Sequence, residues 1–232
     1  MIDLRQHTSL GFEADLSAVR GKILAMGAQV DKVLDDSGRA LFERDVALAN
    51  RIILSDSETD SMELEIDHLC LEILARRQPV ASDLRLLTAA LKIVVDLERV
   101  GDLGVSIASR VVELGGEPPL LPYDDLLRML STSREMVSES LAALQAQDVT
   151  RAGLVIDKDE VVDAYYAQIF NQVLRLMRDN SEDVARATRI QAISKYIERI
   201  ADHAVNVAER VIFVLTGEDV RHTVRLPRGA LS

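Results

Sequence analysis

The sequence predicts an all-α fold made of two tandem, pseudosymmetric three-helix bundles with six long helices. The 232-residue chain is poor in Pro, Gly and aromatic residues and rich in Leu, Ala, Val, Glu, Asp and Arg, which favours helices over sheets. All five prolines lie at breaks, so the stretches between them are free to form long helices. The second half of the chain also repeats the residue pattern of the first.

The first half contains three periodic stretches, which predict helices of about 30 residues each. The first stretch has apolar residues three and four positions apart, the narrow seam of a coiled-coil-like helix: Leu16, Val19, Ile23, Met26, Val30 and Val33. The second is expected to begin at an N-cap formed by Asp45 and to end before Pro79. The third is expected to have Ser82 or Asp83 as its N-cap and to end at Gly115-Gly116.

The second half predicts the same plan. Its helices are expected at about 123–145, 148–179 and from 183 to just before Gly217. We therefore assign residues 1–116 to a first three-helix bundle, 117–122 to a Pro-rich linker, 123–217 to a second bundle and 218–232 to a basic tail. The tail, RHTVRLPRGALS, is interpreted as a solvated end rather than a binding arm.

The internal repeat can be followed position by position. At an offset of 100 residues, identical residues meet for Asp83, Ile93, Glu98, Arg99, Asp102, Val105, Ala108, Arg110 and Val111. In the middle helix the offset is 103, so that Asp45-Val46 matches Asp148-Val149. The difference of three residues falls in a loop, where changes of length are tolerated.

Charge and composition exclude several function classes. The formal net charge of −11 disfavours nucleic acid and anionic lipid as partners, because both bind basic surfaces. The single cysteine, Cys70, allows neither an intramolecular disulfide nor a Cys-based zinc site. The N-terminus does not read as a secretory signal, and no apolar run approaches the ~20 residues of a membrane span. We expect a cytoplasmic protein with no transmembrane segment.

Four pairs of acidic residues recur at a spacing of four residues. The runs DLERVGD at 96–102 and YIERIAD at 196–202 each place a Glu one helical turn before an Asp. Together with matching pairs in the two middle helices, the set is Asp56, Asp60, Glu98, Asp102, Asp159, Asp163, Glu198 and Asp202. Glu63 and Asp67 extend the first stripe by two further turns.

These acidic pairs are expected to lie outside the core. On a helical wheel the stripe of the second helix is roughly 110° from the centre of its apolar face. Two adjacent antiparallel helices would therefore bring two pairs together on an accessible flank of each bundle. Such oxygen ligands suit hard cations such as Mg²⁺, Ca²⁺, Mn²⁺ or iron. The alternative is a solvated acidic surface, since like charges at this spacing cost only about 0.2–0.5 kcal/mol.

Two further features accompany the motif helices. Gly101 and Gly104, matched by Ala201 and Ala204, are small residues in the motif helices, and glycine costs about 1 kcal/mol in a helix interior. Close approach of a helix beside the acidic flank would explain this cost, and plain packing would explain it equally well. Arg99 and its equivalent Arg199 could neutralise part of the cluster, contact a bound anion or pair with a neighbouring helix, and we favour this structural ion pair.

The runs ARRQPVASDLRLLTAALKIVVDLERVGDLG and SKYIERIADHAVNVAERV, with the paired acidic motifs, resemble the PhoU family of phosphate-transport accessory regulators. The resemblance extends from the GFEADL start to the end of the sixth helix. It implies two pseudosymmetric three-helix bundles and surface metal clusters on the acidic motifs, with iron, zinc, manganese or magnesium as the ion. The second copy departs from the first at Tyr196 and Ala201, where the first has Asp96 and Gly101, so the two clusters are expected to differ.

The resemblance also implies a function. The protein would be a cytoplasmic negative regulator of phosphate uptake and of the phosphate-starvation response. It would couple the ATPase subunit of the phosphate ABC importer to a phosphate-sensing histidine kinase, and it would form a homodimer.

Helical proteins of this kind also include adaptors, phosphotransfer modules and di-iron enzymes. A metal-free helical adaptor remains an alternative, as does a histidine phosphotransfer module using His68 or His203. A ferritin-like di-iron enzyme needs two inward Glu-x-x-His motifs, and only Glu65-x-x-His68 is present. No Gly-rich phosphate loop or nucleophile–base pair is legible, so we expect a protein that is not an enzyme.

Overall fold

The computed structural model describes residues 4–115 and 117–220, with side chains from residue 11 onward. The basic tail expected at 218–232 lies outside these residues from 221 onward. The described chain contains no strand and consists of α1 (Leu4–Glu43), α2 (Val46–Leu54), α3 (Ser57–Arg77), α4 (Ala81–Leu114), α5 (Asp124–Ala146), α6 (Val149–Asp179), the 3-10 helix η1 (Ser181–Asp183) and α7 (Val184–Thr216).

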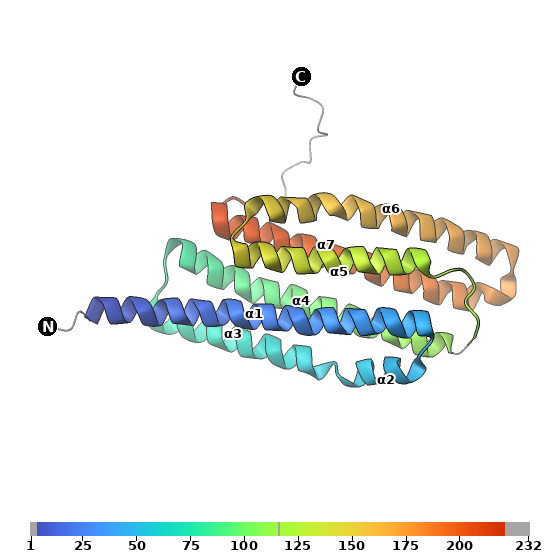
Figure 1. The fold of residues 1–232 in the computed structure, drawn as a ribbon, viewed down its shortest axis with the longest axis horizontal. Coiled ribbons are helices and arrows are strands. Elements are labelled where there is room, and N and C mark those ends of the chain that lie inside the picture. Colours follow the sequence, from blue (N-terminus) through green and yellow to red (C-terminus); the bar gives the residue numbers. More distant parts are fainter. Residues whose placement is uncertain (1–3, 116, 221–232) are drawn as a thin grey trace, which may run out of the picture.

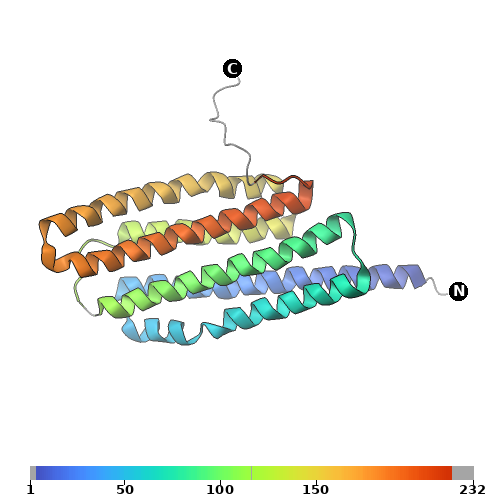
Figure 2. The same cartoon turned by 180° about the vertical axis from the view of Figure 1, so that it is seen from behind.

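The helices form an elongated bundle with their long axes side by side (Figures 1 and 2). In the middle lie α1, α4, α5 and α7, where α1 contacts α5 and α4 contacts α7. The outer layers are α2 with α3 on one side and α6 on the other. None of the described helices is both long and apolar enough to span a bilayer.

Most expected helices are confirmed, but the second one is not continuous. Instead of one helix after Asp45, the chain forms α2 and α3 with a break at Ser55 and Asp56. At the break Ser55 donates both its backbone N–H and its hydroxyl to the carbonyl of Ile52, at 3.1 and 2.9 Å. Ser and Asp side chains compete with helical backbone bonding, which accounts for the interruption in Ser55-Asp56-Ser57. The equivalent segment of α6 is Lys158-Asp159-Glu160, and it remains helical.

The helix starts were predicted with mixed success. Asp45 is the N-cap of α2 as expected, and its side chain accepts a hydrogen bond from the backbone N–H of Leu48. The expectation of Ser82 or Asp83 as N-cap of the third helix is wrong. Pro79 is followed by the extended residue Val80, and α4 begins directly at Ala81. Because the extended residue Val80 takes the N-cap position, Ser82 and Asp83 lie inside the first turn of α4.

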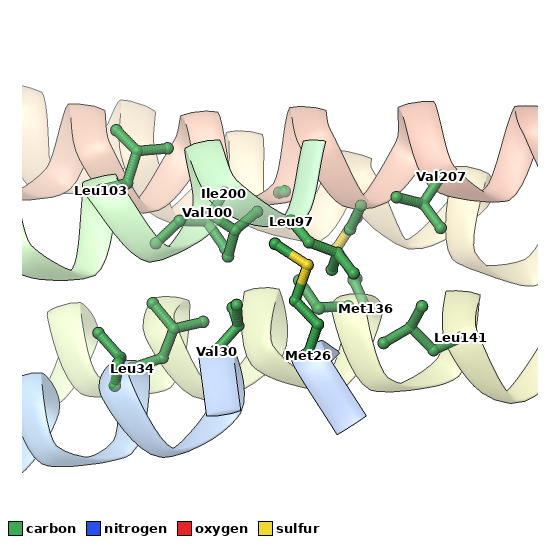
Figure 3. Close-up of a cluster of buried hydrophobic side chains, with 14 of the residues drawn as sticks. Met26, Val30, Leu34, Leu97, Val100, Leu103, Met136, Leu141, Ile200 and Val207 are labelled. Atoms are coloured by element: carbon green, nitrogen blue, oxygen red, sulfur yellow. The ribbon is translucent and has the colours of Figure 1, made fainter. Parts of the chain in front are cut away.

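The two halves share a single hydrophobic core. Buried residues from all seven α-helices form one continuous cluster. At its centre, α1 and α4 of the first half meet α5 and α7 of the second (Figure 3). The labelled members are Met26, Val30, Leu34, Leu97, Val100, Leu103, Met136, Leu141, Ile200 and Val207. Burial of these side chains stabilises the contact between the halves as well as each half, at about 25 cal/mol per Å² of apolar surface.

Close helix approach at Gly104 is confirmed. A Cβ added there would lie only 2.8 Å from Val33 Cγ1, so no larger residue fits between α4 and α1. The buried hydroxyl of Ser37 donates a 2.9 Å hydrogen bond to the Gly104 carbonyl. The glycine therefore fixes the spacing of the helix that carries the DLERVGD motif.

Candidate functional site: an acidic cluster on each half

Carboxylates from two helices of the first half converge at one point. Asp60 lies in the first turn of α3, and Glu98 and Asp102 lie one turn apart on α4. One oxygen from each of the three can be chosen so that all lie within 4.8 Å of one another. The position of Asp60 at the start of α3 is favourable, since a helix N-terminus stabilises negative charge.

The first cluster is larger than these three residues. We define it as Asp56, Asp60, Glu63, Asp67, Glu98 and Asp102. Asp56 stands at the helix break, and the repulsion of Asp102 and Asp60 reaches it. Burial, followed by the charges of Asp67, Asp60 and Asp102, raises the pKa of Glu63. Glu63 and Asp67 were recognised as an extension of the stripe but not as members of the site.

The electrostatics of the first cluster favour the binding of a positive charge. Burial, followed by the charge of Asp102, raises the pKa of Glu98 to about 7. Burial and neighbouring carboxylates also raise the pKa of Asp56 and of Glu63. One oxygen of Glu98 and one of Asp67 are buried without a hydrogen-bond partner. Buried unpaired oxygens are costly unless a proton or a cation satisfies them.

Gly101 brings the two acidic helices together. A Cβ added to this residue would lie 3.2 Å from Thr59 Cγ2, on the helix that carries Asp60. Thr59 is buried against α4 at this point. The expectation of close helix approach beside the acidic flank is therefore confirmed for the first half.

Arg99 contacts the first cluster from its rim. Its guanidinium lies 3.3 Å from Glu98 and 3.2 Å from Asp102, while more than half of its side chain is exposed. The pair with a neighbouring helix that was favoured for Arg99 is not what the structure shows. Arg99 instead pairs within α4 and neutralises part of the cluster. It does not cancel the repulsion, because the pKa of Glu98 stays raised despite the lowering effect of Arg99.

The second half carries the equivalent residues in a different environment. We define the second cluster as Asp159 and Asp163 of α6 with Glu198 and Asp202 of α7. Burial, then Glu198, raises the pKa of Asp202, and Asp163 contributes in the same direction from α6. Asp159 has an interaction of its own. Within the part of the chain with described side chains, only the first cluster brings three potential ligand atoms within 4.8 Å.

A lysine occupies the second cluster. Lys195 Nζ lies 2.7 Å from one oxygen of Glu198 and 2.6 Å from the other. The same ammonium lies 5.4 Å from the centre of the Tyr166 ring, within the range of a cation–π contact. The hydrogen bond to Glu198 raises the pKa of Lys195, so the lysine stays charged. Its equivalent in the first half is Val95.

Sequence reasoning missed the role of Asp96. Its carboxylate is only 5% exposed and accepts hydrogen bonds from three residues of α7: His203 at 2.9 Å, Asn206 at 3.2 Å and Arg210 at 2.9 Å. Burial raises the pKa of Asp96, but the contacts with His203 and Arg210 outweigh it and hold the pKa below its usual value. The available signal was an Asp three residues after Ile93, on the apolar face of the helix.

The arrangement suits cation binding better than proton or phosphoryl transfer. Clustered carboxylate oxygens are the ligands of hard divalent cations. His203, one of the two residues considered for phosphotransfer, is committed to Asp96, whereas His68 is exposed on α3.

Known proteins match the chain over nearly all of its length. The model of the PhoU domain matches residues 23–111 and 126–211, one copy in each half. A phosphate-specific transport system accessory protein PhoU homolog of Pseudomonas aeruginosa is 39% identical over 94% of this chain and 91% of its own length. A homolog of the same name from Clostridium acetobutylicum is 35% identical over 90% of this chain and 96% of its own.

Solved structures agree with these relatives. The crystal structure of PhoU from Pseudomonas aeruginosa has a TM-score of 0.85 and 38% identity, covering 89% of this chain and all of that one. The phosphate transport system regulatory protein PhoU from Streptococcus pneumoniae also has a TM-score of 0.85, with 30% identity over 90% of this chain and 99% of its own. These matches bear out the predicted fold of two tandem three-helix bundles.

Proposed function

Because this chain belongs to the PhoU family, we propose that it is an accessory protein of a phosphate-specific transport system and a negative regulator of phosphate uptake. The relatives that carry this description match 94% and 90% of the chain, so the match extends over both halves. The proposed partners are the ATPase subunit of the phosphate ABC importer and a phosphate-sensing histidine kinase. The protein would act as a homodimer and transmit the state of the importer to the kinase, without catalysing a reaction itself.

We further propose that the acidic motifs bind metal ions, with the first cluster as the stronger site. The observation that carries this proposal is the convergence of Asp60, Glu98 and Asp102 within 4.8 Å. The buried oxygen of Glu98, which has no hydrogen-bond partner and only the ion pair with Arg99 at 3.3 Å, and the raised pKa of Glu98 support it, since a bound cation would lower both penalties. Oxygen-only ligation fits magnesium, manganese or iron, and zinc also accepts carboxylates.

The second cluster would bind metal more weakly. Lys195 already supplies a positive charge to Glu198 at 2.6–2.7 Å, so a metal ion would have to displace it. The ligands proposed for the second cluster are Asp159, Asp163, Glu198 and Asp202, which correspond to the four residues of the acidic pairs in the first half. A difference in occupancy between the two clusters follows from this one substitution.

A metal-free adaptor is the second candidate, and the contacts of Arg99 favour it. This arginine bridges Glu98 and Asp102 and could serve as the permanent counter-charge of the first cluster. The adaptor would then present its helical faces to partners, with the acidic residues acting only as a solvated surface. The two candidates differ in whether the carboxylates are needed for regulation.

A complementation experiment tests the regulatory role. In a strain that lacks the gene, phosphate-starvation genes should be expressed even at high phosphate, and the wild-type protein should restore repression. The variant Asp60→Asn/Glu98→Gln/Asp102→Asn should fail to restore it at equal protein level. A matched control is Glu72→Gln, which alters an exposed acid of α3 outside the first cluster. Repression that persists in the deletion strain would refute the proposed function, and full repression by the triple variant would favour the metal-free adaptor.

A further inference from the structure

Two pairs of helices join the halves of the chain. They are α1 with α5 and α4 with α7, and we call their contacts the seam. Both pairs lie in the middle of the molecule, between the outer layers (Figures 1 and 2). The acidic clusters do not form part of the seam, because the first lies between α3 and α4 and the second lies between α6 and α7.

Glycines of α1 face leucines of α5 in a reciprocal pattern. A Cβ added at Gly27 would overlap Leu141, and a Cβ added at Gly38 would lie 2.9 Å from Leu130 Cδ2. The offset of 103 also aligns α1 with α5, where Met26 meets Met129 and Leu41 meets Leu144. At this offset Leu130 is the equivalent of Gly27, and Leu141 is the equivalent of Gly38. Gly27 thus contacts the equivalent of Gly38, and Gly38 contacts the equivalent of Gly27. Such reciprocal contacts are the pattern of a two-fold interface.

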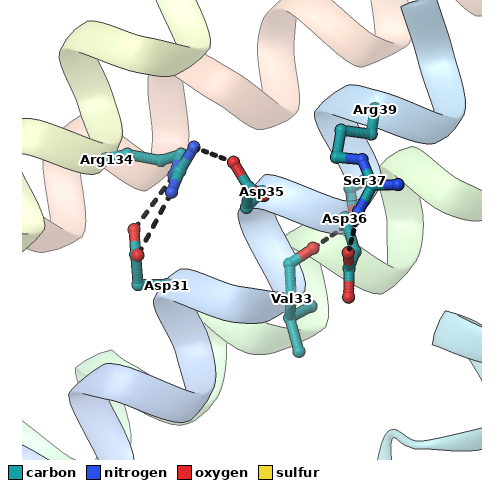
Figure 4. Close-up of polar contacts among 7 residues, drawn as sticks. All are labelled: Asp31, Val33, Asp35, Asp36, Ser37, Arg39 and Arg134. Atoms are coloured by element: carbon teal, nitrogen blue, oxygen red, sulfur yellow. Dashed lines mark hydrogen bonds and ion pairs between the residues drawn. The ribbon is translucent and has the colours of Figure 1, made fainter. Parts of the chain in front are cut away.

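An ion pair lies between these two contacts. Arg134 of α5 contacts Asp31 at 2.9 and 3.1 Å and Asp35 at 2.5 Å, both on α1 (Figure 4). Asp31 is the equivalent of Arg134 at the same offset of 103. Equivalent positions of the two halves therefore meet here with opposite charges.

The α4–α7 pair has the same polarity of charge. Asp96 of α4 accepts from His203, Asn206 and Arg210 of α7. Farther along, Glu113 of α4 lies 3.0 Å from Arg189. At Asp31, Asp35, Asp96 and Glu113 alike, the first half supplies the carboxylate and the second half supplies the donor.

We propose that the seam pairs only unlike halves of this chain. A first half against a copy of itself would place Gly27 opposite Gly38 and Asp31 opposite Asp31, leaving voids and repelling charges. A second half against its copy would place Leu130 opposite Leu141 and Arg134 opposite Arg134, with overpacking and repulsion. A second copy of the chain can therefore use the seam only by exchanging halves, and like halves are rejected by shape and by charge.

Alanine substitutions test the notches. Gly27→Ala should lower the melting temperature of the full chain, whereas in a Leu141→Ala background the same change should raise it, because alanine is the better helix former. Gly21→Ala on the same helix is the control, since a Cβ there meets nothing within 4 Å and should raise the melting temperature in both backgrounds. A rise with Gly27→Ala in the otherwise wild-type chain would refute the notch.

Charge exchange tests the rejection of like halves. Arg134→Asp imitates first-half pairing and Asp31→Arg imitates second-half pairing, and each should lower the melting temperature by a few degrees. The double variant Asp31→Arg/Arg134→Asp should recover part of the sum of these losses. Arg128→Asp, an exposed arginine of α5, should cause no comparable loss. A double variant that merely adds the two losses would overturn the proposal.

Discussion

The two halves of the molecule place the same acidic motif in different surroundings. In the first half Gly101 lets α3 approach α4, and the carboxylates of Asp60, Glu98 and Asp102 gather within 4.8 Å of one another. In the second half Ala201 stands at the equivalent position, and the ammonium of Lys195 binds Glu198 directly. A spacing repeated within one chain therefore does not imply equal chemistry, because the residues next to the carboxylates differ between the two halves.

The largest effect is expected at Asp96, which has Tyr196 as its counterpart. Asp96→Ala leaves His203 and Arg210 buried without their acceptor and should cost about 3–5 kcal/mol of unfolding free energy. Chemical denaturation with urea measures this loss. Asp96→Asn keeps the side-chain volume and part of the hydrogen bonding, so it should cost less. Equal and small losses in both variants would show that the Asp96 contacts contribute little to the joining of the halves.

The pH dependence of stability should differ between the halves. In the first cluster the pKa of Glu98 is about 7 in the folded protein, against 4.5 for an ordinary Glu. Between these values the folded state holds a proton that the unfolded state has lost. With chelator present, the unfolding free energy should therefore fall as the pH rises from about 5 to about 8, by at most about 3 kcal/mol.

Glu98→Gln should flatten this dependence, because glutamine does not titrate. Glu198→Gln is the matched change in the second half, where Lys195 pairs with the carboxylate, and it should leave the slope that Glu98 causes in place. Urea titrations of the three proteins at several pH values provide the comparison. An identical slope in the wild type and in Glu98→Gln would show that the raised pKa does not contribute to stability.

Exchange of the residues at the lysine position should change metal affinity by about tenfold, which corresponds to about 1.4 kcal/mol. Lys195→Val removes the ammonium from the second cluster and should strengthen its binding of Mn²⁺. Val95→Lys places an ammonium three residues before Glu98 and should weaken binding at the first cluster. Calorimetric titration with Mn²⁺ measures both. Unchanged binding in Lys195→Val would mean that the lysine is not what distinguishes the clusters.

The smallest effect is expected from Gly101→Ala. The helix gains up to about 1 kcal/mol from the better propensity of alanine, while the added methyl group lies 3.2 Å from Thr59 and crowds α3. The unfolding free energy should therefore change by less than about 1 kcal/mol, but Mn²⁺ affinity at the first cluster should fall as α3 moves outward. Ala201→Gly serves as the matched change in the second half and should leave the first cluster unaffected.

The fold could be predicted from the sequence largely because its signals are local. Apolar residues at a spacing of three and four fix the helix faces, and the prolines fix the breaks. The interruption at Ser55 and Asp56 escaped prediction because Ile52 and Ile66 were placed on one helical face, although residues 55–61 contain no apolar residue. A stripe shows which face is buried, not whether the backbone hydrogen bonds are continuous.

The acidic residues of the candidate site could be predicted from the sequence, but the difference between the two clusters could not. The four acidic pairs follow from spacing alone, since residues four apart share a helix face. That Lys195 turns toward Glu198 depends on a rotamer and on the Tyr166 ring, neither of which the spacing reveals. Asp96 escaped for a similar reason, because its three donors come from more than one hundred residues away.

The central claim is that carboxylates of α3 and α4 together hold a cation. Elemental analysis of protein purified without chelator, then dialysed against limiting Mn²⁺, tests it most directly. We predict at least one tightly held ion per chain, lost in Glu98→Gln/Asp102→Asn and retained in both Glu72→Gln and Glu198→Gln/Asp202→Asn. A metal content that is the same in all four proteins would contradict the claim.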